Sequence, residues 1–110
     1  METATDFEIL KTLTHEQALQ HVGKTFRLMH QGNAVLELSL DAAELLMPNR
    51  PRSKRMKRDP FSLYFIGPPE PLLPQAMYVL ENDDVRFHGI FLVPVGRRED
   101  LCYEYEAVFT

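Results

Sequence analysis

The sequence predicts a mainly β domain: a six-stranded, strongly bent antiparallel barrel or roll with one short N-terminal helix. Three observations support this fold class. From position 25 onward, apolar side chains recur at every second residue, which is the period of a strand with one buried face. The expected strands follow one another at hairpin spacing without intervening helices, which favours antiparallel pairing. A flat sheet would leave two edges and a large apolar face uncovered, and rolling or closing the sheet removes both.

Length and composition set the limits of this prediction. The 110 residues are 45% hydrophobic and 25% charged, as expected for one globular domain over residues 1–110. The single cysteine, Cys102, excludes an internal disulfide and a multi-cysteine metal site. No run approaches the ~18 apolar residues of a membrane-spanning helix, and the first residues are acidic rather than basic and apolar. We therefore expect a cytoplasmic protein without a membrane segment.

The one helix is expected over about residues 15–22, at one end of the barrel. Thr14 and Gln17 have the spacing of a capping box, in which each side chain binds the backbone of the other residue. Gly23 supplies the left-handed residue that ends the helix. The apolar stripe is thin, because it consists of Ala18, Leu19 and Val22 alone.

The strands begin with a hairpin. Residues 25–29 and 35–41 alternate between apolar and polar side chains on either side of a tight turn at residues 31–33. Residues 42–47 fit either a longer strand or one helical turn, and the pattern leaves both open.

The other strands are expected at residues 61–66, 77–80, 85–95 and 103–109. Residues 67–74 are proline-rich and predict a stiff, extended connection. Gly89, in the middle of a long strand, indicates a bulge or a sharp bend. We expect two faces on that strand, with Phe87, Phe91 and Val93 on one and Ile90 and Leu92 on the other.

A basic segment stands out in an otherwise acidic chain. Six of the twelve Lys and Arg residues lie in positions 50–58, which contain no acid, in a loop expected over about residues 48–60. The rest of the chain has six basic residues against sixteen acidic ones. The segment fits contact with a nucleic acid or another polyanion, docking on an acidic protein surface, or a solvated loop that keeps the protein soluble. The candidate polyanion contacts are Arg50, Arg52, Lys54, Arg55, Lys57 and Arg58.

Groups that could carry catalysis do not converge in the sequence. His15 and His21 are six residues apart on the expected helix, so they point in different directions and do not form a metal pair. Glu104 and Glu106 share a strand face, a spacing that suits a sugar or a metal ion, but a solvated face has the same pattern and is favoured. No phosphate-binding glycine loop or hydrolase motif occurs. We therefore expect no catalytic residue, no metal and no cofactor.

Leu72, Leu73, Pro74 and Gln75 are a candidate partner contact within the proline-rich connection. The two leucines either fold back over the mouth of the barrel or form a rigid apolar hook, which would lose little entropy on binding.

Several short motifs together resemble a family of small bacterial single-domain proteins known as a domain of unknown function. These motifs are PFSL-x-F-x-GP at residues 60–68, LPQ-x-x-Y at 73–78, FLVPVG at 91–96 and YEAVF at 105–109. The resemblance spans about residues 20–110 and concerns strand cores and turn prolines. It therefore implies a shared fold and no particular activity, and the basic insertion before Pro60 corresponds to a variable part of that pattern.

We expect a non-enzymatic accessory or protein-interaction module whose partner is another protein, a larger assembly or a second copy of this chain. The alternative is a polyanion or nucleic-acid binder that works through residues 50–58. A third hypothesis, an enzyme or small-ligand carrier, would need an apolar cavity inside the barrel with inward polar groups such as Tyr78, His88 or Tyr105.

Overall fold

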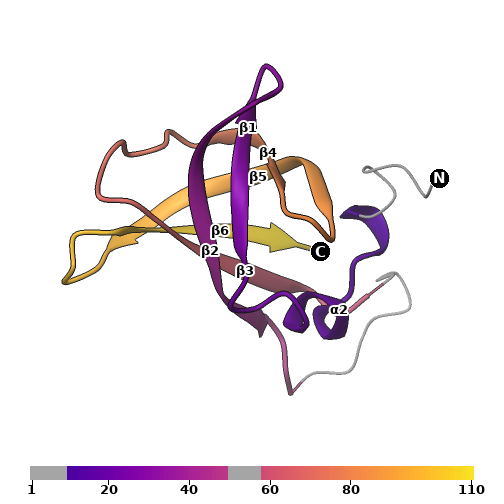
Figure 1. The fold of residues 1–110 in the computed structure, drawn as a ribbon. Helices are drawn as coiled ribbons and strands as arrows, with labels where there is room; N and C mark the ends of the chain where they lie inside the picture. The colour runs from indigo at the N-terminus through magenta and orange to yellow at the C-terminus, as the bar shows by residue number, and fades with distance from the viewer. Residues whose placement is uncertain (1–9, 50–57) are drawn as a thin grey trace.

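The computed structural model describes residues 10–49 and 58–110, which fold into a closed antiparallel barrel (Figure 1). Around the barrel the strands follow the order β1-β2-β3-β6-β5-β4, and β4 pairs with β1 to close the sheet. The expected mainly β fold with six antiparallel strands is therefore confirmed. The strands are β1 (Thr25–His30), β2 (Asn33–Leu45), β3 (Phe61–Gly67), β4 (Ala76–Glu81), β5 (Arg86–Arg97) and β6 (Tyr103–Phe109).

The interior of the barrel is filled by aromatic and aliphatic side chains from all six strands. Phe26 lies at the centre of the aromatic contacts, stacked on Phe87 at 5.3 Å and edge-on to Phe65 at 5.7 Å between ring centroids. Burial of such rings is the main source of stability in a small domain without disulfides. The largest fully buried apolar side chains are Tyr105, Phe26, Phe61, Phe65, Phe87, Leu38, Leu40, Leu63, Leu80 and Leu92.

Helix α2 (His15–Leu19) lies at one end of the barrel. The capping box is confirmed, since Thr14 Oγ1 accepts from the Gln17 amide and the Gln17 side chain accepts from the Thr14 amide. The helix is shorter than predicted, because residues 20–23 form turns that end at Gly23, whose φ is 92°. Its apolar stripe is also reduced to Ala18, which joins the core.

Strand β2 continues through residues 42–45, so the longer-strand alternative holds. The β2–β3 register shifts between Leu40 and Ala42, and this shift turns Ala43 toward the core after Leu40. Beyond the strand, the Leu46 amide donates to the Pro60 carbonyl at 2.9 Å. This hydrogen bond joins the two chain segments at the base of the basic loop.

The bulge predicted at Gly89 is present, and it corrects the predicted faces of β5. Gly89 has a φ of 88°, and the β4–β5 register shifts opposite it, between Tyr78 and Val79. Because the bulge adds one residue, Phe87 points into the core together with Ile90 and Leu92, whereas Phe91 points outward. The expectation that Phe87 and Phe91 share a face was therefore wrong.

Candidate interaction site at the β5–β6 seam

The backbone pairing between β5 and β6 covers only part of the two strands. Backbone pairing between these strands runs from Val93↔Glu106 to Arg97↔Tyr103. Among the residues that the structure describes, residues 86–92 of β5, apart from the bulged Gly89, pair with β4 alone, and residues 107–109 of β6 pair with β3 alone. The strands thus present unpaired edges to each other at residues 89–91 and 107–109, which we call the seam.

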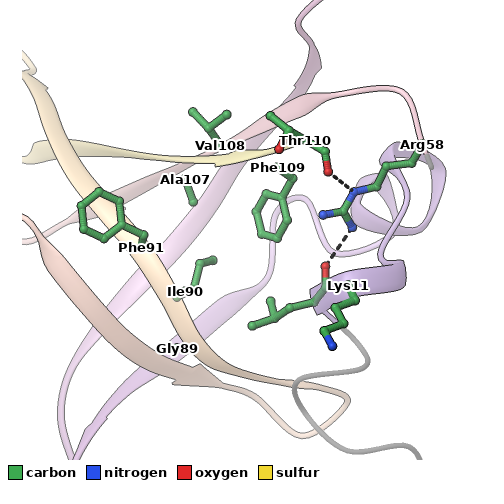
Figure 2. A pocket seen from close by; sticks show the side chains of 10 residues that line it. Lys11, Arg58, Gly89, Ile90, Phe91, Ala107, Val108, Phe109 and Thr110 are labelled. Carbon is green, nitrogen blue, oxygen red and sulfur yellow. Dashed lines mark hydrogen bonds between the residues drawn. The ribbon is translucent and has the colours of Figure 1, made fainter. Parts of the chain in front are cut away.

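A groove of about 300 Å³ occupies the seam (Figure 2). Ile90 and Phe109 line its inner part, and Leu10, just before α2 in the chain, lines it from the N-terminal side. Two cationic side chains, Lys11 and Arg58, belong to the same lining. The site therefore combines an apolar slot with positive charge at the end of the barrel.

Arg58 holds this end of the barrel together through backbone oxygens. Its Nη1 donates to the Leu10 carbonyl at 2.8 Å, and its Nε donates to the Thr110 oxygen at 3.2 Å (Figure 2). Nη1 also donates to the Leu13 carbonyl at 2.6 Å. The planar guanidinium carries several donors in a fixed fork, so one side chain can bind three segments at once. Arg58 thereby joins the N-terminal segment, the start of β3 and the end of β6.

Two aromatic rings support the Arg58 guanidinium. Its central carbon lies 5.4 Å from the Phe109 ring centroid and 5.7 Å from that of Phe61, and these rings stack on each other at 4.9 Å. Burial lowers the pKa of Arg58 from its ordinary value, because the charged form loses water. None of the Asp and Glu side chains that the structure describes lies within 4 Å of it.

A row of large apolar side chains lies exposed outside the seam. Met77 of β4 and Phe91 of β5 are register partners, and Phe91 and Val108 of β6 both line the groove. These three side chains are 62%, 44% and 56% exposed, respectively. Single exposed apolar residues are ordinary, but several exposed apolar side chains gathered beside one groove are typical of a binding surface. We call these three residues the apolar row.

The structure describes Arg58 among the six basic residues predicted as polyanion contacts. The other five, Arg50, Arg52, Lys54, Arg55 and Lys57, lie outside the described residues. Arg58 has the structural contacts given above, which its place in a basic run did not indicate.

The predicted partner contact at residues 72–75 is partly buried and partly exposed. Leu73 is buried in the core, and its amide donates to the Tyr105 hydroxyl at 2.9 Å. The Pro74 carbonyl accepts from the Tyr78 hydroxyl at 2.5 Å. Leu72 is 51% exposed, and Pro74 and Gln75 are also exposed, so they remain accessible to a partner.

The three polar groups considered for an internal site have different surroundings. Tyr105 points inward, and burial raises the pKa of its phenol. The Tyr78 hydroxyl is bound to the proline-rich connection, and burial raises its pKa as well. His88 is exposed on β5. The two tyrosine hydroxyls therefore bind adjacent residues of the proline-rich connection, Leu73 and Pro74.

Glu106 lies in a small polar cluster on the outer face of β3 and β6. One carboxylate oxygen accepts from the Ser62 hydroxyl at 2.6 Å and from the Tyr64 hydroxyl at 3.1 Å. Burial and this hydrogen bond raise the pKa of Tyr64. Glu104 lies next to Arg98 instead, at 3.5 Å. The two glutamates are half-buried and bind different neighbours, so the face is less solvated than expected.

The described residues contain neither a cluster of potential metal ligands nor a membrane-spanning helix. No group of three or more His, Cys, Asp and Glu side chains in residues 10–49 and 58–110 could hold a metal ion. Within the same residues, no helix has the length and apolar character needed to cross a membrane.

Sequence reasoning missed the seam and the apolar row. The available signal was the bulge at Gly89, because one added residue reverses the alternation and turns Phe91 outward. The parts played by Leu10 and Lys11 left no comparable signal, since they depend on how the N-terminal segment meets strands far away in the chain.

Comparisons with known proteins address the family of this chain. Neither a search of curated proteins nor a search of solved structures found a match. The model of one protein family, described as a domain of unknown function (DUF6916), matches residues 13–109. This match includes all six strands and the whole seam, whereas Leu10, Lys11 and Thr110 of the groove lie outside it. The chain therefore belongs to the DUF6916 family.

Proposed function

We propose that this protein is a non-enzymatic interaction module that binds another polypeptide through the outer face of β4, β5 and β6. The observation that carries the proposal is the apolar row, Met77, Phe91 and Val108, exposed beside the groove of the seam. Apolar and aromatic side chains supply most of the binding energy at protein interfaces. The packed interior favours a surface role over a ligand carried inside the barrel. The family resemblance supports action in a bacterium, and we propose that the protein acts in its cytoplasm.

The test is site-specific photo-crosslinking in the cells that produce the protein. A photoreactive phenylalanine analogue is placed at Phe91 and, as a matched control, at Val35 of β2, which is 54% exposed. We expect one discrete crosslinked species at position 91 and none at position 35. A crosslinked dimer of the chain itself counts as the same result, since a second copy is a polypeptide partner.

A substitution then tests whether the surface carries the binding. Phe91→Ser should abolish copurification of the crosslinked species, whereas Val35→Ser should retain it, because only the former removes an apolar anchor. Equal crosslinking at both positions, or copurification that survives Phe91→Ser, contradicts the proposal.

The second candidate function is polyanion binding through residues 50–58, favoured by the segregation of charge in the sequence. The test measures affinity for fluorescent DNA at about 0.05 and 0.2 M salt, because phosphate contacts give a steep salt dependence. Arg50, Arg52, Lys54 and Lys57 are changed to Ser, and Arg58 is left in place because it supports the fold. Salt-sensitive binding that disappears in this variant supports the candidate, and absence of binding at low salt removes it.

A further inference from the structure

We propose that the seam receives an extended segment of a partner polypeptide in which apolar and acidic residues alternate, and that this segment adds to the barrel as a strand between β5 and β6. This inference rests on the proposed interaction function and names the class of partner. Three features carry it: unpaired backbone edges, the shape and lining of the groove, and the charge at its open end.

The backbone edges provide the hydrogen-bonding surface. Within the described part of the chain, Ile90 and Phe91 pair with β4 on one side only, the bulged Gly89 has no register partner, and residues 107–109 pair with β3 on one side only. An unpaired strand edge is a template on which an extended peptide can form main-chain hydrogen bonds. Here two such edges face the same groove, so one inserted segment can pair on both of its sides.

The groove fits a short segment with alternating side chains. Its volume of about 300 Å³ is at the lower end of the range of about 300–1,000 Å³ for ligand sites. Its inner part is lined by Ile90 and Phe109, Leu10 also lines it, and Phe91 and Val108 point outward. Because successive side chains of a strand point to opposite faces, every second residue of the segment would enter this apolar lining.

The charge at the open end selects acidic residues. Lys11 is exposed there, and Arg58 is half-buried nearby. None of the Asp and Glu side chains in the described part of the chain lies within 4 Å of either cation. A carboxylate on the incoming segment would complement this positive charge, and a basic segment would be repelled.

The experiment uses the full chain and short fluorescent peptides, with affinity measured by fluorescence anisotropy. The probe is a synthetic peptide in which Glu and Val alternate. One control replaces every Glu by Lys, and the other carries N-methyl groups on alternate backbone nitrogens, which removes donors without changing the side chains. We expect both controls to bind at least about tenfold more weakly than the probe.

A matched pair of variants tests the charge without disturbing the Arg58 contacts. Lys11→Gln should weaken binding of the probe about two- to fivefold at about 0.05 M salt, the range for exposed charge pairs. Lys24→Gln, which neutralises an exposed lysine whose described partner is Asp84, should leave the affinity unchanged. Amide NMR shifts on titration should concentrate at Gly89, Phe91 and Val108.

The results separate strand addition from its alternatives. Equal binding of the N-methylated peptide overturns the proposal, because the groove would then take side chains without main-chain pairing. Failure of the probe to bind the full chain also overturns it.

The two proposals can fail separately. A crosslinked partner that depends on Phe91 but no binding of the alternating peptide would refute strand addition alone. Peptide binding as expected, with no discrete crosslink at Phe91, would refute the cellular interaction while the chemistry of the groove stands.

Discussion

Arg58 links parts of the chain that are distant in sequence. Its guanidinium binds the carbonyls of Leu10 and Leu13 and the oxygen of Thr110, and it lies over the stacked rings of Phe61 and Phe109. Loss of this group would leave part-buried carbonyls without donors, which costs more than loss of a solvated contact.

We expect Arg58→Met to lower the free energy of unfolding by about 2–3 kcal/mol, because it removes hydrogen bonds made by a charged donor. Urea denaturation followed by circular dichroism measures the change. The control is Arg98→Met, whose exposed ion pairs at 3.5 and 3.9 Å should contribute less than about 1 kcal/mol. Equal losses of unfolding free energy in the two variants would contradict a stabilising role for the Arg58 hydrogen bonds, which we call the Arg58 clamp.

Burial of the His21 imidazole should make the stability of the fold depend on pH. Its Nδ1 atom is buried without a hydrogen-bond partner among the described residues. Burial, followed by the nearby Lys24, lowers the pKa of His21 from 6.5, and Asp84 opposes this shift. Below pH 6.5 the unfolded chain therefore binds more protons at this position than the folded chain, so stability falls as the pH drops.

The urea midpoint of the wild type should therefore fall further than that of His21→Gln when the pH is lowered from about 7.5 to about 5.5. The effect should be small, since the ring is only partly buried. Parallel pH profiles of the two proteins would show that His21 does not contribute.

At the scale of the elements, the bulge of β5 determines which side chains reach the surface. Gly89 has a φ of 88°, a conformation that other residues adopt only at a cost. The resulting shift places Phe91 in the apolar row and Ile90 in the core. Without the bulge, simple alternation would bury Phe91 and remove the row.

Gly89→Ala should lower the free energy of unfolding by about 1–2 kcal/mol through backbone strain. Its added Cβ would lie 3.4 Å from the Met77 Cε atom, the end of a flexible side chain. Gly96→Ala is the matched control, because that glycine lies on the same strand without a positive φ and its Cβ would likewise meet a side-chain end, Glu104 Oε1, at 3.4 Å. Thermal denaturation should show a clearly lower midpoint for Gly89→Ala than for the control.

Local patterns predicted the elements well where one rule acts alone. Alternation located six strands, and the Thr14 and Gln17 spacing located the start of α2. The same patterns failed where a bulge interrupts the alternation of a strand and where the apolar stripe of a helix is only partly buried. Gly89 indicated the bulge, but simple alternation assigned the faces of β5 after the bulge incorrectly. The helix is shorter than predicted because only Ala18 of its apolar stripe is covered by the core.

At the scale of the whole molecule, the barrel closes through the short pairing of β1 with β4. Three residue pairs make this contact, including Arg27↔Glu81. The Glu81 carboxylate lies 3.6 Å from Arg27 of β1 and 2.8 Å from Arg86 of β5, so it forms ion pairs with both neighbouring strands. Its side chain is 18% exposed, whereas that of Asp83, 3.4 Å from Arg27, is 95% exposed.

Glu81→Gln should therefore lower the free energy of unfolding by about 1 kcal/mol at low salt, and by less at about 1 M NaCl, where screening weakens the lost attraction. Asp83→Asn should have a smaller effect, because solvent already screens that carboxylate. Denaturant titrations at both salt concentrations make the comparison. A loss for Glu81→Gln that is independent of salt would point to packing rather than charge.

The candidate site is formed by segments of the chain that are distant in sequence. The seam depends on β3 lying between β2 and β6, and on Leu10 and Arg58 meeting β6 at one end. These contacts join residues more than forty positions apart, and no local pattern encodes them. The sequence therefore predicted a barrel with loops available for binding, but not which part of its wall stays open.

The Leu46–Pro60 hydrogen bond and the Arg58 clamp have a practical consequence for protein engineering. Both fasten the chain at the root of the basic loop, so the barrel is anchored independently of what is inserted between residues 50 and 57. Doubling the length of a flexible loop costs only about 0.6 kcal/mol in closure entropy. An epitope or a reporter sequence inserted in this loop should therefore leave the fold of the barrel unchanged.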